Sequence, residues 1–249
     1  MEHAPILLLV LPLIGATVIP LTRFRFSNLF LTTSLLGSTF FSIIAFGQSL
    51  NVGTIRYNLG GWSPPWGIEL IIDPLSGLFT TLVSGIGVLA TFYSIPFLKE
   101  WTIQRAGVYR SIFCLLIVGL QGIVITGDFF NLYVFLEISS IAAYALLSTG
   151  GNKSTLAVFR YLLIGTIAAS FYLLGVGYLY ALTGSLNMAD VAARVAQLDN
   201  PLALVLATSL ILIGLSIKSA LFPLHGWLPD VYTYAPGPAV GFVAAIMTK

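Results

Sequence analysis

Two ionisable side chains stand inside long apolar stretches of this chain. Glu137 lies within Leu-Tyr-Val-Phe-Leu-Glu-Ile, eight residues after Phe129, and Lys218 lies within Gly-Leu-Ser-Ile-Lys-Ser-Ala. A charged side chain at the centre of a membrane-spanning helix costs about 2.5 to 3.5 kcal/mol, so such residues usually pair with one another or relay protons and ions. We therefore predict that Glu137 and Lys218 approach each other and carry protons. The alternatives are a protonated structural glutamate and a lysine that reaches the headgroups.

Two further residues extend this candidate site. His225 follows Lys218 by seven residues, which places it two turns along the same face if the helix continues, although Pro223 makes the alignment approximate. A proton relay and a structural hydrogen bond both suit this histidine. Lys249 lies eleven residues beyond Pro238, or roughly 17 Å of helical rise, and so at a similar depth in the membrane.

The remaining polar residues have simpler interpretations. Asp73 and Asp128 each precede an apolar run and are expected to cap helices. Arg110 and Arg160 lie near the ends of predicted spans and are expected to extend toward the headgroups. Cys114, the single cysteine, lies within an apolar run and is expected to be an inert buried thiol.

The composition excludes several classes of protein. Of the 249 residues, 57% are hydrophobic and 8% are charged, against roughly 25% charged in a soluble domain. A soluble globular protein and a disordered chain are both excluded, and a net charge of +2 gives no reason to expect nucleic-acid binding. There is no Gly-rich phosphate loop, paired-cysteine motif, histidine cluster or nucleophile elbow, so we expect no cofactor, no metal, and no redox or hydrolytic site in this chain.

The apolar runs predict an all-α polytopic membrane protein with seven to eight spans, because about 20 residues cross a bilayer as a helix. The expected spans are 4–21, 27–48, 70–97, 107–126, 129–149, 156–182 and 201–222, with an eighth that starts near 238 and is incomplete. Thirty residues from Pro201 to Asp230, interrupted by Pro223 and Gly226, predict a discontinuous seventh helix that breaks near Lys218.

The connections add two elements and an orientation. Alternation over 54–59, followed by Gly-Gly and a Trp- and Pro-rich turn, predicts a small β-hairpin in an outer loop. An apolar face over 187–198 predicts a short helix in the interface plane. The positive-inside rule places the N-terminus outside the plasma (inner) membrane of the cell, because seven basic residues fall on one side and two on the other: Arg23, Arg25, Lys99, Arg105, Arg110, Lys153 and Arg160 against Arg56 and Arg194.

Several motifs carry a resemblance to a known family. They are Gly127-Asp-Phe-Phe-Asn-Leu-Tyr-Val-Phe-Leu-Glu137-Ile-Ser-Ser, Lys218-Ser-Ala-Leu-Phe-Pro-Leu-His225-Gly-Trp-Leu-Pro-Asp230, Ala235-Pro-Gly-Pro238, Tyr180-Ala-Leu-Thr-Gly-Ser-Leu-Asn187-Met-Ala-Asp190 and Ile72-Asp-Pro-Leu-Ser76. Together they resemble the proton-conducting antiporter-like subunits of Mrp-type sodium/proton antiporters, membrane-bound hydrogenases and respiratory complex I. The tyrosine-rich form of the Glu137 motif resembles the Mrp and hydrogenase branch more than the quinone-reductase branch.

The resemblance implies a fold and a path. In the family, a glutamate on the fifth helix pairs with a lysine on the broken seventh, and a lysine on the eighth continues a polar axis; the matching residues are Glu137, Lys218 and Lys249, with His225 between. Helices four to eight and nine to thirteen of the family form two inverted repeats. The resemblance therefore divides the single transmembrane domain, 1–249, into three N-terminal helices (1–98) and an incomplete first repeat (107–249).

The leading hypothesis is a subunit of a multisubunit cation/proton translocating complex that provides a proton half-channel. Its expected partners are other membrane subunits, the lipid bilayer and protons, with sodium as a second candidate ion, and redox centres would belong to the partner chains. A transport-inactive structural subunit is one alternative. A membrane anchor for quinone or haem is another, which the single intramembrane histidine disfavours.

Overall fold

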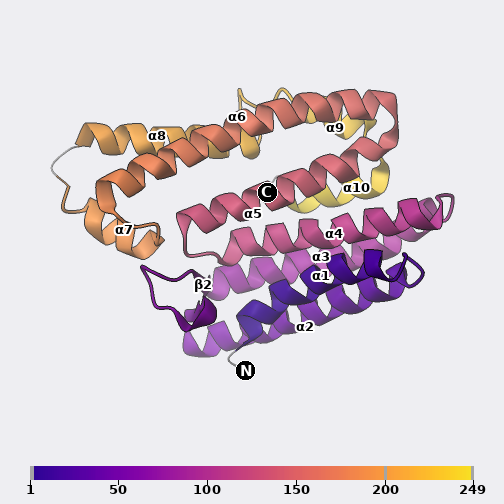
Figure 1. The fold of residues 1–249 in the computed structure, drawn as a ribbon, viewed down its shortest axis with the longest axis horizontal. Helices are drawn as coiled ribbons and strands as arrows, with labels where there is room; N and C mark the ends of the chain where they lie inside the picture. Colours follow the sequence, from indigo (N-terminus) through magenta and orange to yellow (C-terminus); the bar gives the residue numbers. More distant parts are fainter. Residues whose placement is uncertain (1–2, 199–200, 248–249) are drawn as a thin grey trace.

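The computed structural model describes residues 3–198 and 201–247. Most of the helices run nearly parallel to one another along the long axis of the molecule (Figure 1). The α-helices are α1 (Ala4–Leu21), α2 (Ser27–Val52), α3 (Pro74–Leu98), α4 (Ile103–Ile125), α5 (Phe129–Leu147), α6 (Asn152–Thr183), α7 (Met188–Val195), α8 (Pro201–Lys218), α9 (Leu228–Tyr234) and α10 (Gly237–Phe242). Short 3₁₀ turns, η1 (Leu59–Gly61) and η2 (Ser148–Gly150), and a π-helical turn, η3 (Val243–Met247), complete the helical set.

The length and composition of six helices, α1 to α6, suit them to cross a membrane, as judged over the described residues. The seventh apolar segment is divided: α8 ends at Lys218, a turn region follows, and α9 begins at Leu228. The eighth, Gly237–Met247, is short within the described part of the chain. The predicted fold class and the discontinuous seventh helix are thus confirmed.

Helix α4 forms the centre of the bundle. In its most apolar window 72% of the residues are buried inside the molecule, against 33 to 44% for the other five spans. It packs on α1, α2 and α3 on one side and on α5 on the other (Figure 1). The other spans thus leave much of their apolar surface outside the packing within this chain, and α4 is the most buried of the six.

The predicted β-hairpin is confirmed, and one of its strands lies where the start of a helix was predicted. Strand β1 (Ile55–Asn58) pairs antiparallel with β2 (Glu69–Ile72), with Ile55 opposite Ile72. Residues 70–72, predicted as the start of a span, therefore belong to a strand. The helix begins at Pro74, because Asp73 caps it and proline is favoured in the first turn.

Glycines bring α6 and α8 into close contact. A Cβ added to Gly175 would lie 2.7 Å from the Ala207 carbonyl oxygen, and one added to Gly214 would lie 2.6 Å from the Ala168 carbonyl oxygen. Small residues at such positions let the backbones of membrane helices approach closely. The position of Lys218, one turn beyond Gly214, is therefore set by backbone packing.

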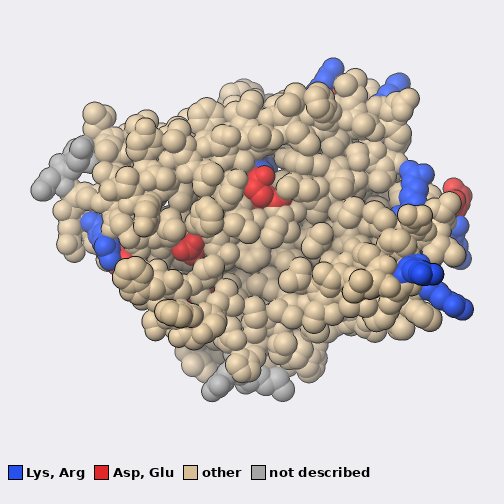
Figure 2. Space-filling model, in the orientation of Figure 1, with Lys and Arg blue, Asp and Glu red and all other residues tan. Residues whose placement is uncertain are grey.

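Basic side chains gather at one end of the molecule. Figure 2 shows most blue atoms at the right-hand end, where the α1–α2, α3–α4 and α5–α6 connections lie, and a smaller group at the opposite end near the hairpin and α7. The tan surface between the two ends shows few charged atoms (Figure 2). The sequence predicted two groups of basic residues, seven on one side and two on the other, and these groups correspond to the two ends of the bundle.

Candidate functional site

Glu137 and Lys218 form an ion pair in the apolar bundle. The Lys218 Nζ atom lies 2.9 Å from Glu137 Oε1, and it also donates a hydrogen bond of 2.7 Å to Ser140 Oγ. The Lys218 side chain is 10% exposed and that of Glu137 is 27% exposed. The predicted approach of the two residues is confirmed, and the pair joins α5 to the C-terminal end of α8.

Ser140 is a site residue that sequence reasoning missed. It lies three residues after Glu137, on the same face of α5, because residues three apart are neighbours on a helix. That spacing was the signal that could have identified it. Helix α5 packs closely on α4 beside Ser139, because residue 119 of α4 is a glycine. A Cβ added to Gly119 would lie 2.6 Å from the backbone nitrogen of Ser139.

The end of α8 is closed by local hydrogen bonds, which is why the helix can break within the membrane. Ala220 has φ +53°, its amide donates to the Ile217 carbonyl at 3.2 Å, and the Leu221 amide donates to the Ser216 carbonyl at 2.9 Å. This is the Schellman pattern, in which a residue in left-handed conformation ends a helix and satisfies its last carbonyls. Irregular backbone at membrane depth requires such internal satisfaction.

Trp227 fixes the far side of the break. Its Nε1 donates to the Ile217 carbonyl at 3.1 Å, and its ring stacks on Tyr161 of α6 with centroids 3.9 Å apart and planes 6° apart. Tyr161 in turn packs edge-on against Tyr144 of α5. The residue adjacent to Lys218 is therefore tied to both α5 and α6, which makes Trp227 a positioning residue for the ion pair.

The other two predicted site residues, His225 and Lys249, are not part of the ion pair. His225 lies in the turn region between α8 and α9, so it does not stack above Lys218 on a continuous helix. The centroids of the His225 and Phe222 rings lie 5.6 Å apart. The buried Nδ1 atom of His225 has no hydrogen-bond partner among the described residues. Lys249 lies outside the described residues.

A cavity reaches the ion pair from the side. It has a volume of about 530 Å³, and its lining includes Lys218, Ser139 and Ser140 together with apolar residues of α3, α4 and α8. A lysine ammonium has three donors. Glu137 and Ser140 occupy two of them, so the cavity offers the third a place where water can bind.

A second polar cluster, also missed from the sequence, lies at the end of the molecule that carries the hairpin. Glu69 of β2 is buried and pairs with Arg56 Nη1 at 2.9 Å, and its other carboxylate oxygen accepts a hydrogen bond of 3.2 Å from Asn187 Nδ2. The backbone also joins here, since the Gly127 amide donates to the Glu69 carbonyl and the Met188 amide donates to the Gly127 carbonyl. Both Glu69 oxygens are thus occupied by structural partners.

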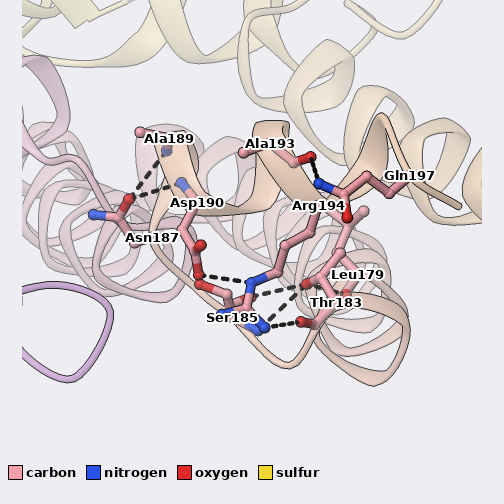
Figure 3. Close-up of polar contacts among 9 residues, drawn as sticks. All are labelled: Leu179, Thr183, Ser185, Asn187, Ala189, Asp190, Ala193, Arg194 and Gln197. Atoms are coloured by element: carbon pink, nitrogen blue, oxygen red, sulfur yellow. Dashed lines mark hydrogen bonds and ion pairs between the residues drawn. The ribbon is translucent and has the colours of Figure 1, made fainter.

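The connection from α6 to α7 completes this end (Figure 3). Asn187 caps α7 by accepting hydrogen bonds from the amides of Ala189 and Asp190, both at 3.1 Å. Arg194 pairs with Asp190 at 2.9 Å and donates to the Thr183 carbonyl at 2.9 Å (Figure 3). The predicted short helix over this segment is confirmed.

The two aspartates act as helix caps, as predicted. Asp128 Oδ1 accepts the Asn131 amide at 2.7 Å, and burial raises the pKa of Asp128 while that amide opposes the shift. Asp73 forms a full capping box: its Oδ1 accepts the Ser76 amide at 2.7 Å, and its own amide donates to Ser76 Oγ at 2.8 Å. The backbone amide of Ser76, with help from the Ser76 hydroxyl, holds the pKa of Asp73 below its usual value.

The two arginines expected to extend toward the headgroups differ in their exposure. Arg110 is more buried than expected: its side chain is 9% exposed and donates to Ser27 Oγ at the start of α2 at 3.0 Å. Arg160 is exposed and pairs with Asp230 at 3.1 Å, which joins α6 to α9. Among the described residues no group of three or more His, Cys, Asp or Glu side chains gathers in a way that could hold a metal ion.

Comparison with known proteins decides the family. The profile described as "NADH:quinone oxidoreductase/Mrp antiporter, TM" matches residues 126–249, the segment that carries Glu137 and Lys218. The chain belongs to the family of antiporter-like membrane subunits. It is 49% identical to the NADH-quinone oxidoreductase subunit N of Desulforudis audaxviator, over 99% of this chain and 50% of that protein.

Two further similar proteins support the assignment to this family. A probable K(+)/H(+) antiporter subunit of Rhizobium meliloti is 34% identical over 100% of this chain and 47% of its own length. The structure of the membrane-bound sulfane sulfur reductase, an archaeal respiratory membrane complex, contains a chain that is 35% identical with a TM-score of 0.93, covering 100% of this chain and 51% of that one. The chain therefore spans about half the length of the relatives it matches, and these relatives include both quinone-reductase and antiporter subunits.

Proposed function

We propose that this chain is a membrane subunit of a multisubunit cation/proton translocating complex and that Glu137 and Lys218 carry the protons. One observation supports this most strongly. A glutamate and a lysine meet at 2.9 Å where a membrane helix is broken, beside a cavity that can hold water. Broken helices of this kind form ion sites in transporters.

The pair suggests a mechanism. The Glu137 carboxylate would stabilise the charged Lys218 ammonium through their direct contact. Separation of the pair or neutralisation of Glu137 would release a proton from Lys218 into the cavity, and restoration of the contact would load it again. Ser140 holds the ammonium in place during that cycle.

The proton path would extend beyond the pair of Glu137 and Lys218. His225, with its unpartnered buried nitrogen, would accept the proton that Lys218 releases, and Lys249 would carry it onward to a neighbouring subunit. Residues 107–249 would belong to the first of the family's inverted repeats, after three helices in 1–98. The basic end would face the cytoplasm, with the N-terminus outside the plasma membrane, and sodium or a proton would be the coupled ion. Any redox chemistry of the complex would belong to partner chains.

Mutation of the pair tests the proposal. In the complete complex reconstituted in proteoliposomes, Glu137→Ala and Lys218→Ala should each abolish ion-coupled proton flux, and the double variant should be little worse than either. Arg160→Ala and Asp230→Ala are the matched controls, because they remove an exposed ion pair of similar length. The controls should retain flux. Near-wild-type flux in either single variant of the pair would favour a transport-inactive structural subunit instead.

A further inference from the structure

Arg110 is a buried cation without an anionic partner among the described residues. It lies seven residues into α4, about 10 Å by helical rise, and its guanidinium donates to the neutral Ser27 hydroxyl. The four ion pairs found in the described part of the chain involve other side chains. A buried guanidinium that lacks a carboxylate keeps most of its desolvation cost. An anion beside Arg110 would offset that cost.

A cavity next to Arg110 collects more positive charge. It has a volume of about 910 Å³ and lies between the α1–α2 and α3–α4 connections. Three further cations line it, Arg23, Arg25 and Lys99, and no acidic side chain is among its described lining residues. Glu100 lines a separate, smaller cavity. Four positive charges therefore face one space without a carboxylate to balance them.

The backbone of the α1–α2 turn is held in a strained shape over this cavity. Arg23 and Phe24 are consecutive residues with positive φ, +49° and +64°, which non-glycine residues rarely adopt. Phe24 is locked against α4, because a Cβ added to Gly107 would overlap the Phe24 ring. Such strain persists only where the surroundings impose it and is concentrated at functional sites. Here it keeps Arg23 and Arg25 on the rim of the cavity.

The cavity also has an apolar wall at the membrane boundary. Phe26, Leu29 and Ile103 line it and are exposed. Exposed apolar side chains at the ends of spanning helices face acyl chains, and aromatic residues such as Trp101, which also lines the cavity, favour the headgroup level. Its occupant should therefore combine a negative head with a hydrocarbon tail.

We propose that this cavity binds the phosphate headgroup of an anionic phospholipid. The Arg110 guanidinium, whose planar fork suits phosphate, contacts the phosphate at the base. Arg23, Arg25 and Lys99 supply the surrounding positive charge, and the acyl chains follow Phe26, Leu29 and Ile103. Basic pockets between membrane helices are a recognised form of lipid site. The phosphate chemistry would also suit free inorganic phosphate, so the test separates the two sources.

The test uses the complete complex, delipidated in detergent. We expect phosphatidylglycerol in mixed micelles to raise its Tm and native mass spectrometry to show bound phospholipid, whereas phosphatidylcholine and inorganic phosphate at equal concentration leave Tm unchanged. Arg110→Gln should weaken phosphatidylglycerol binding at least tenfold. Arg160→Gln, at the same end but outside the cavity, should bind within twofold of wild type.

Several outcomes would overturn the proposal. They are equal effects of the two lipids, a Tm shift that inorganic phosphate reproduces alone, unchanged binding by Arg110→Gln, or an acidic segment of a neighbouring subunit found in the cavity by crosslinking from position 25. If Arg110→Gln does not fold, the double variant Arg23→Gln/Arg25→Gln replaces it, because both side chains are exposed on the rim. This double variant should also lose at least tenfold in affinity, and unchanged binding would contradict the site.

Discussion

Lys218 shows how a single charge is accommodated in an apolar bundle. Its ammonium has one ionic partner, Glu137, one neutral partner, Ser140, and a side that borders the cavity. Removal of one partner from a buried pair leaves the other charge uncompensated, at a cost of about 3 to 5 kcal/mol. The loss of either charge is therefore expected to affect both stability and flux, and flux must be normalised to the amount of assembled complex.

Asp73 gives a prediction about pH. Its capping box stabilises the start of α3, and Asp73→Ala should cost about 1 kcal/mol at neutral pH. The pKa of Asp73 is lowered in the folded state. Its contribution is therefore complete above the unfolded value of about 3.9 and is lost as the pH falls through the lower, folded value.

Thermal unfolding in detergent checks this sign. The Tm of the wild type should exceed that of Asp73→Ala from pH 5 to 8, and the difference should shrink below about pH 4. Asp73→Asn serves as the control, because asparagine caps helices without titrating, and it should keep its Tm advantage over Asp73→Ala in acid. A difference that grew with acidity would contradict the argument.

At the scale of elements, the contact between α6 and α8 carries a prediction about the site. Gly214→Ala would place a methyl group 2.6 Å from the Ala168 carbonyl oxygen, and overpacking of this kind costs about 1 to 3 kcal/mol. The α8 helix must then move away from α6, and Lys218 moves with it. We expect a lower Tm and reduced proton flux.

Gly177→Ala is the matched control on α6, because nothing lies within 4 Å of its added Cβ. It should leave flux unchanged, and Tm should stay the same or rise, since alanine favours helix over glycine. Equal effects of the two substitutions would show that helix packing at Gly214 does not position Lys218.

Sequence reasoning identifies elements and residues wherever the signal is local. Glu137 and Lys218 stand out because each interrupts an apolar run, and the break after Lys218 follows from nearby Pro and Gly. The burial of Arg110 was not foreseen, because its partner Ser27 lies 83 residues away and no local pattern reports such a contact. Glu69 was missed for the same reason: its partner Asn187 is 118 residues distant. Residues 70–72 were expected to be helical because an apolar run alone does not separate strand from helix.

At the scale of the whole molecule, the orientation in the membrane can be tested with single cysteines. Gln104 is exposed in the first turn of α4 at the basic end, and Ser63 is exposed in the hairpin connection at the other. Gln104→Cys should react with an impermeant maleimide only from the cytoplasmic side, and Ser63→Cys only from outside. The native Cys114 is buried and 0% exposed, so it adds no background. If position 104 were labelled only from the outer face, the orientation of the protein in the membrane would be the opposite of the one proposed.

The distance in sequence between Glu137 and Lys218 has a consequence for biosynthesis. The two residues are 81 positions apart, which a ribosome working at about 5 to 20 residues per second covers in roughly 4 to 16 s. During that interval α5 must enter the bilayer with a glutamate whose partner has not been synthesised. Its insertion therefore depends on the apolar neighbours of Glu137, and the ion pair forms afterwards, when α8 arrives. The attraction between the two charges thus acts on the assembly of helices that are already inserted, and it gives the newly made α8 a specific place to dock.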